Sequence, residues 1–136
     1  MTKPISAVVA LRLVELEQLD LDRKMITFRD FPEFCREARE RGGIFFRDFE
    51  CDALTLRHLM SMTANGPPGT RFMYNPVAYS WTSRPMSEVA RTPFSALVAK
   101  YVFEPAGMQN SARAHRSLPL RADLAEARWR NRTHLI

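Results

Sequence analysis

The chain has little cysteine, histidine and glycine. It carries 2 cysteines, 3 histidines and 5 glycines in 136 residues. Cys35 and Cys51 make neither a disulfide framework nor a metal-ligand set, and we expect two core thiols of a protein in a reducing compartment. His115 and His134 have no partners at metal-ligand spacing. We therefore predict that the chain holds no metal and no cofactor.

Long apolar runs are also missing, and no stretch has the length that a membrane span needs. The first apolar segment lacks the small-residue cleavage site of a signal peptide. We expect no membrane partner, and a cytoplasmic location if the sequence is complete as given. The hydrophobic content of 46% is typical of a globular chain rather than a disordered one. The length suits one domain of ordinary size.

The net charge of +5 comes largely from arginines in the last quarter of the sequence. They are Arg113, Arg116, Arg121, Arg128, Arg130 and Arg132. A basic tail can bind nucleic acid. Only Trp129 lies among these arginines as a base-stacking aromatic, and no nucleic-acid-binding motif accompanies them. We expect a basic tail over residues 113–136, in which Ser117 and Pro119 can start one helix before an irregular end.

The first twenty residues predict one long helix with a broad apolar face. The apolar positions recur at helical spacing and are Ile5, Val8, Val9, Leu13 and Leu16. Pro4 is compatible with this helix because proline is tolerated in the first turn. A face this broad is typical of a helix buried inside a domain.

The middle of the chain predicts a second helix and an ambiguous segment. The second helix begins after Asp30, which with Glu33 makes a candidate capping box, has Pro32 in its first turn and ends at Gly42. The apolar run within residues 44–50 suits a strand or a packed loop, since its periodicity cannot separate the two. At most a short β-hairpin is expected there.

Further helices are predicted over residues 55–63 and 77–90, the latter interrupted by Pro85, and from a cap at Thr92 to an end at residues 103–108. The fold class is therefore mainly α. The expected core consists of Val9, Leu13, Leu56, Leu59, Phe94, Leu97 and Tyr101.

Four strings resemble, in the same order, those of one enzyme family. They are MTKPISAVVALRLVELEQLDLDRKM at residues 1–25, LTLRHLMSMT at 54–63, PGTRFMYN at 68–75 and FEPAGM at 103–108. Similar strings occur in the beta-lactamase-related serine hydrolases, which include class C beta-lactamases, DD-peptidases and esterases. The resemblance implies that residues 1–112 are a partial beta-lactamase-related domain.

The first string resembles the region that carries the family's Ser-x-x-Lys motif. Met1 and Thr2 match its middle positions and Lys3 matches its lysine, so the serine would precede Met1. A spacing of three places serine and lysine on the same helix face, one turn apart. The lysine amine can then take the hydroxyl proton or steady the charge on the oxygen. The resemblance thus implies a catalytic Lys3.

The third string contains Tyr74, which matches the catalytic tyrosine of the family. In those enzymes the phenol acts as a general base or relays the proton of the leaving group. This sequence departs from the family because Pro76, and not asparagine, stands two residues after Tyr74, while Asn75 comes one residue early. His58 lies in the second string at a position that the family does not use for catalysis, and we expect it to hydrogen-bond a loop.

A further departure is the short spacing between the helix at residues 55–63 and the turn at Pro68 and Gly69. Relatives place some tens of residues there, and that region commonly carries part of the substrate pocket. The family fold also contains a large antiparallel sheet that supplies a third motif and an oxyanion-hole amide. No strand of that kind is predicted, so we expect the helical part of the fold without the sheet.

The resemblance implies a parent enzyme that hydrolyses a small-molecule ester, amide or beta-lactam through a serine acyl-enzyme. We expect the chain alone to be inactive, because it lacks the nucleophile. Two alternatives stay open. One is a non-catalytic helical interaction module that self-associates through exposed core surface. The other, weaker alternative is nucleic-acid binding through the basic tail.

Overall fold

The computed structural model describes residues 2–108 and 111, and this part of the chain is mainly helical, as the sequence predicts. The elements in order are α1 (Thr2–Glu15), the 3₁₀ helix η1 (Met25–Thr27), α2 (Phe31–Arg41), α3 (Leu56–Met60), α4 (Pro76–Ser80), α5 (Ser83–Ala90), α6 (Phe94–Val98) and the π-helix η2 (Ala99–Phe103). The described residues include no β-strand longer than an isolated bridge. The expected tail at residues 113–136 lies outside the described residues.

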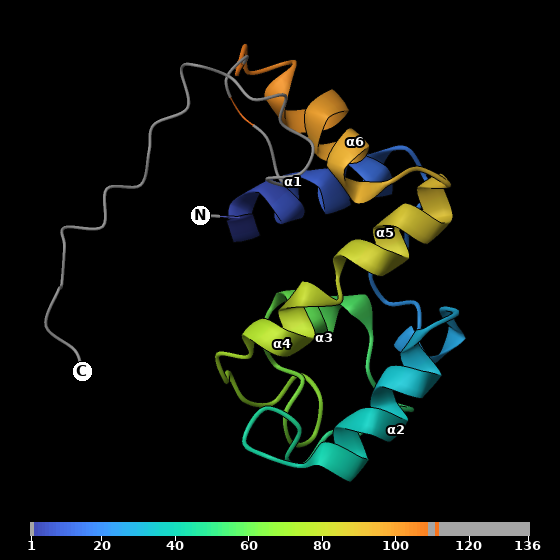
Figure 1. The fold of residues 1–136 in the computed structure, drawn as a ribbon, viewed down its shortest axis with the longest axis vertical. Helices are drawn as coiled ribbons and strands as arrows, with labels where there is room; N and C mark the ends of the chain where they lie inside the picture. Colours follow the sequence, from blue (N-terminus) through green and yellow to red (C-terminus); the bar gives the residue numbers. More distant parts are fainter. Residues whose placement is uncertain (1, 109–110, 112–136) are drawn as a thin grey trace, which may run out of the picture.

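The helices form two groups (Figure 1). In the first, α1 packs against α5, α6 and η2, and in the second, α2, α3 and α4 surround the loops between them. The chain passes from α4 directly into α5 and so joins the two groups. Within the described residues, no helix is both long enough and apolar enough to cross a membrane.

Helix α1 is shorter than predicted and is buried on one side only. It ends at Glu15 because Glu17 adopts a left-handed conformation with φ 56°, and the N–H group of Gln18 turns back to the carbonyl of Leu13. Val9 and Leu13 are fully buried, but Val8 and Leu11 are 47% and 56% exposed. The expectation that the whole apolar face is buried is therefore wrong for the described residues.

Helix α2 ends at Gly42 as predicted, but it begins without the capping box. Asp30 occupies the N-cap position in a helical backbone conformation and makes no side-chain capping bond. Its carboxylate instead lies 3.7 Å from Arg84, while Glu33 pairs with Arg36 at 3.1 Å. The two carboxyl groups therefore form ion pairs with arginines rather than bonds with the helix N-terminus.

Two other predicted boundaries also move. Thr92 does not cap α6, because its hydroxyl donates to the carbonyl of Ala90 and Pro93 precedes the helix. Pro85 lies in the first turn of α5, where proline is tolerated, and the helical segment is broken earlier, around Trp81.

The segment around residues 43–50 forms turns and not a hairpin. Phe49 makes an isolated bridge with Asn65 and is buried, whereas Ile44 is 68% exposed. The Phe34 ring contacts the rings of Phe46 and Phe49 edge-on. This segment is therefore a loop that packs onto α2 through its aromatic side chains.

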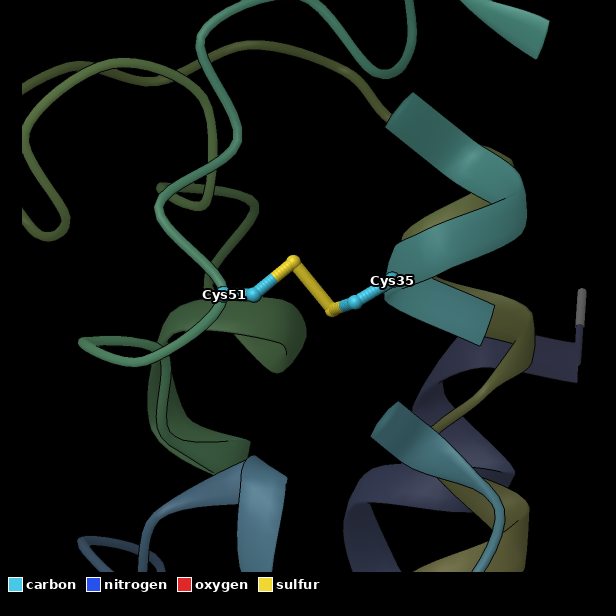
Figure 2. The surroundings of a disulfide bond; sticks show 2 residues. All are labelled: Cys35 and Cys51. Carbon is cyan, nitrogen blue, oxygen red and sulfur yellow. A yellow bond between two sulfur atoms is a disulfide. The ribbon is translucent and has the colours of Figure 1, made fainter. Parts of the chain in front are cut away.

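Cys35 and Cys51 form a disulfide, so the expectation of two core thiols is wrong (Figure 2). Cys35 lies on α2 and Cys51 lies in the loop before α3. Both are buried, as expected of core cysteines. Sequence composition did not reveal the pairing, because a single pair of cysteines makes no framework pattern. The bond ties α2 to the segment that leads into α3.

The core agrees closely with the sequence-based expectation. Six of the seven expected residues are buried, and Tyr101 is partly buried against them. The buried six are Val9, Leu13, Leu56, Leu59, Phe94 and Leu97.

Reduction of the disulfide should destabilise the protein. The two cysteines are 16 residues apart in sequence, and closing a loop of that length in the unfolded chain is worth about 3 kcal/mol in the chain-entropy picture. Urea unfolding with and without reductant measures the change. The double variant Cys35→Ala/Cys51→Ala is the control, and its unfolding midpoint should not respond to reductant. A midpoint of the wild-type protein that reductant leaves unchanged would contradict the prediction.

Candidate active site

The structure brings Lys3 and Tyr74 together. Lys3 lies in the first turn of α1, and Tyr74 ends an extended segment just before α4. The Lys3 ammonium Nζ donates a hydrogen bond of 3.0 Å to the Tyr74 hydroxyl, across 71 residues of sequence. Tyr74 is 56% exposed, so this pair is open to a ligand from solvent. The two residues that the motifs single out therefore form one contact.

Tyr79, which the sequence did not single out, also reaches Lys3. Its hydroxyl donates a 2.8 Å hydrogen bond to the Lys3 backbone carbonyl. The Lys3 Nζ atom lies 5.6 Å from the centroid of the Tyr79 ring. Burial raises the pKa of the Tyr79 phenol above its ordinary value, so this hydroxyl remains a donor at neutral pH. The only sequence signal was an aromatic residue on a short helix after Tyr74.

Asn75, the residue after Tyr74, is buried and has a structural role. Its side-chain oxygen accepts from the N–H group of Ala78 at the start of α4. Its amide nitrogen donates to the Phe45 carbonyl at 2.7 Å and to the Asn65 side-chain oxygen at 2.9 Å. Asn75 therefore caps α4 and points away from solvent. The Asn75-Pro76 pair, an N-cap followed by proline, is a recognisable helix start.

Asn65 completes this buried amide network. Its own amide nitrogen donates to the carbonyl groups of Phe45 and Arg47. Asn65 is 2% exposed and Asn75 is 1% exposed. The network ties the loop at residues 44–50 to the start of α4, and it thereby fixes the residue that follows Tyr74.

His58 has a structural role, as the sequence predicts. Its Nδ1 atom accepts the backbone N–H of Thr55 at 3.1 Å, and the Thr55 hydroxyl accepts the N–H of His58, which together form a capping box for α3. Burial, and then the positive charge of Lys24, lower the pKa of the His58 imidazole. The ring is therefore neutral at pH 7 and can accept this bond.

An ion pair fixes the exit from α1 against α3. The Arg57 guanidinium donates to both carboxylate oxygens of Asp22, at 2.7 and 2.8 Å. The backbone N–H group of Arg57 donates to the Leu21 carbonyl. The hydrogen bond from Arg57 lowers the pKa of Asp22. This contact holds the segment after α1 next to the helix that carries His58.

Two serines of the described residues direct their hydroxyls to backbone carbonyls other than that of Lys3. Ser61 donates to the Arg57 carbonyl, and Ser80 donates to the Val77 carbonyl. Ser6 is buried within α1. Across residues 2–108 and 111, no cluster of three or more histidine, cysteine, aspartate or glutamate side chains is placed to hold a metal ion.

Comparison with known proteins gives one match. The sequence model of the beta-lactamase family matches residues 1–116, which is most of the chain. The chain therefore belongs to the beta-lactamase family. Neither a curated protein nor a solved structure matched it. The matched range includes all four strings on which the resemblance was based, with Lys3 and Tyr74 among them.

Replacing Asn75 with alanine should destabilise the fold. The change leaves the Phe45 carbonyl, the Asn65 side chain and the Ala78 N–H group without this partner, and an unsatisfied buried polar group costs about 1–3 kcal/mol. We expect the free energy of unfolding to fall by about 2 kcal/mol or more in urea titrations. Ser80→Ala on the same helix is the control, with an expected change within about 0.5 kcal/mol. Equal losses in the two variants would show that the network contributes little.

His58 should make stability depend on pH. Because its pKa is lower in the folded state than the ordinary value of 6.5, the unfolded chain takes up a proton first as the pH falls. The free energy of unfolding should therefore be highest above about pH 6.5 and decrease below it, until the folded-state pKa is passed. The control is His58→Gln, since glutamine at this position can keep the capping box but does not titrate. The difference in unfolding free energy between the two proteins, measured from pH 7.5 to 4.5, isolates this effect, and a constant difference would refute it.

Proposed function

We propose that the chain provides the lysine and the tyrosine of a serine acyl-transfer site of the beta-lactamase family. The observation that carries this proposal is the hydrogen bond between Lys3 Nζ and the Tyr74 hydroxyl. These two residues match separate motifs of the family, 71 positions apart, and no local constraint of the sequence requires them to meet. Their contact is what a shared catalytic site needs.

The proposed reaction is hydrolysis of a small-molecule ester, amide or beta-lactam. A serine three residues before Lys3 would lie on the same face of α1, one turn earlier. In this step Lys3 acts as the neutral amine: it takes the hydroxyl proton as the serine oxygen attacks the substrate carbonyl, and an acyl-enzyme forms. Tyr74 supplies a proton to the leaving group and regains one from the resulting Lys3 ammonium, and water then cleaves the acyl ester. The Lys3–Tyr74 hydrogen bond gives the proton a direct path between the two groups.

In this proposal, the nucleophile and the oxyanion donors are not among the described residues. The motif places the serine one position before Met1, and the family's sheet would supply an oxyanion amide. We therefore expect the 136-residue chain by itself not to hydrolyse esters or cephalosporins. Lys3 and Tyr74 are then the chain's contribution to the proposed site.

A second candidate function is a non-catalytic helical interaction module. The observation in its favour is the exposed apolar surface of α1 and the residue after it: Val8 and Leu11 on the helix are 47% and 56% exposed, and Leu16 is 38% exposed. An apolar surface of this kind favours association with another surface, including a second copy of the chain. Nucleic-acid binding through the basic tail stays the weakest candidate, because the tail lies outside the described residues.

A serine placed directly before Met1 tests the proposed site. This variant restores Ser-x-x-Lys, and a fluorophosphonate probe should form a covalent adduct at the added serine that intact mass spectrometry detects. Replacing Lys3 with methionine in that variant should slow labelling by about 10²-fold or more, because general-base assistance is worth roughly 10²–10⁴. Tyr74→Phe should slow it as well.

Two controls make this experiment decisive. An alanine at the added position should give no adduct. Lys24→Met should label at the same rate as the serine-bearing parent, because the Lys24 ammonium bonds to the Ala53 carbonyl and not to Tyr74. A labelling rate that Lys3→Met leaves unchanged would refute the proposal. Sedimentation of the unmodified chain as a concentration-dependent dimer, abolished by Leu11→Glu, would then favour the interaction module.

A further inference from the structure

Two different tyrosines contact Lys3, one at its side-chain ammonium and the other at its backbone carbonyl. At the side-chain end, Nζ lies 3.0 Å from the Tyr74 hydroxyl but 5.0 Å from the centroid of that ring, so the hydroxyl is the nearer partner. At the backbone end, the Lys3 carbonyl accepts from the Tyr79 hydroxyl at 2.8 Å. The two tyrosines therefore make different contacts with one lysine.

The Tyr79 hydroxyl is occupied by the backbone of α1, and its ring is what faces the ammonium. A helical carbonyl that already accepts from the N–H group four residues later retains a second lone pair, and Tyr79 uses this acceptor capacity on Lys3. The ring centroid is 5.6 Å from Nζ, within the range in which an aromatic face attracts a cation. Tyr79 is 8% exposed, so its ring is fixed by packing.

The element that carries Tyr79 is itself anchored. Tyr74 and Tyr79 flank the start of α4, and the buried amide group of Asn75 between them bonds to Phe45, Asn65 and Ala78. A lysine side chain has four flexible methylene groups, and holding it in one geometry costs entropy. A contact that fixes where this side chain leaves α1 reduces the space that its ammonium can explore.

We propose that Tyr79 is a positioning residue, which fixes the first turn of α1 through the Lys3 carbonyl and thereby keeps the Lys3 ammonium on the Tyr74 hydroxyl. The chemical importance of that position rests on the proposed function, but the contact itself does not. Tyr79 does not contact the substrate in this scheme; its hydroxyl bonds the Lys3 backbone carbonyl and its ring faces the Lys3 ammonium. Its effect is transmitted only through Lys3.

Lysine-selective NMR of the full chain tests this role. The chain has three lysines, Lys3, Lys24 and Lys100, so carbon-13 labelling at Cε gives a spectrum that single Lys-to-Arg variants can assign. The Lys3 signal should be displaced by the ring currents of the two tyrosines. In Tyr79→Phe, which keeps the ring and removes the hydroxyl, that signal should move towards the position of an unstructured lysine, while the Lys24 signal stays in place.

The matched control is Tyr101→Phe. Lys100 Nζ lies 5.1 Å from the Tyr101 ring centroid, so this is the same substitution at a second lysine–tyrosine contact. It should leave the Lys3 signal unchanged. The proposal would be overturned if the chemical shift of the Lys3 signal were the same in Tyr79→Phe as in the wild-type protein, or if it changed equally in Tyr101→Phe. A merely structural role would lower the unfolding midpoint of Tyr79→Phe without shifting Lys3 in the folded protein.

A measurement on the wild-type protein covers the case in which Tyr79→Phe does not fold. Nuclear Overhauser contacts between the Tyr79 ring protons and the Lys3 side chain are expected from the 5.6 Å separation of Nζ and ring centroid, and their absence would also overturn the proposal. The proposed function has its own test: it is refuted if Lys3→Met leaves the labelling rate of the serine-bearing variant unchanged. The NMR result does not depend on any turnover.

Discussion

The buried amide network around Asn75 is the constraint on which the candidate site depends. Its hydrogen bonds to Phe45, Asn65 and Ala78 fix both the end of the extended segment and the start of α4. Tyr74 precedes this point and Tyr79 follows it by one helical turn, so a single anchored junction presents two phenols to Lys3. The first turn of α1 is thereby joined to a part of the chain that lies more than seventy residues later in the sequence.

Helix α1 is buried on one side and exposes apolar side chains on another. Val9 and Leu13 fill the core against the C-terminal helices, whereas Val8 and Leu11 on the same helix remain exposed. A helix with apolar residues on most of its circumference is stable when both sides are covered. The exposed side is therefore a surface that favours burial against another surface, and it is the observation behind the interaction-module candidate.

The sequence predicted the helices and the core and singled out Lys3 and Tyr74 as separate candidate residues, because each leaves a pattern in local spacing or in a family motif. It did not predict contacts that depend on the tertiary fold. Asp30 and Glu33 had the spacing of a capping box, but their carboxylates pair with Arg84 and Arg36 instead. The disulfide requires Cys35 and Cys51 to approach in space, and the bond from Tyr79 to the Lys3 carbonyl requires α4 to meet α1. Neither approach is visible in residue spacing.

The asparagine of this chain stands one residue earlier than in the family pattern, at Asn75 instead of position 76, and this changes which polar groups lie beside Tyr74. One residue later, at the position of Pro76, a side chain would lie beyond the N-cap of α4, and proline offers no polar group there. Asn75 itself is turned into the core by three hydrogen bonds, so it cannot also face a substrate. The two groups that meet near this point are the ammonium of Lys3 and the hydroxyl of Tyr74. Neither is a side-chain amide of the kind that an asparagine at position 76 would supply.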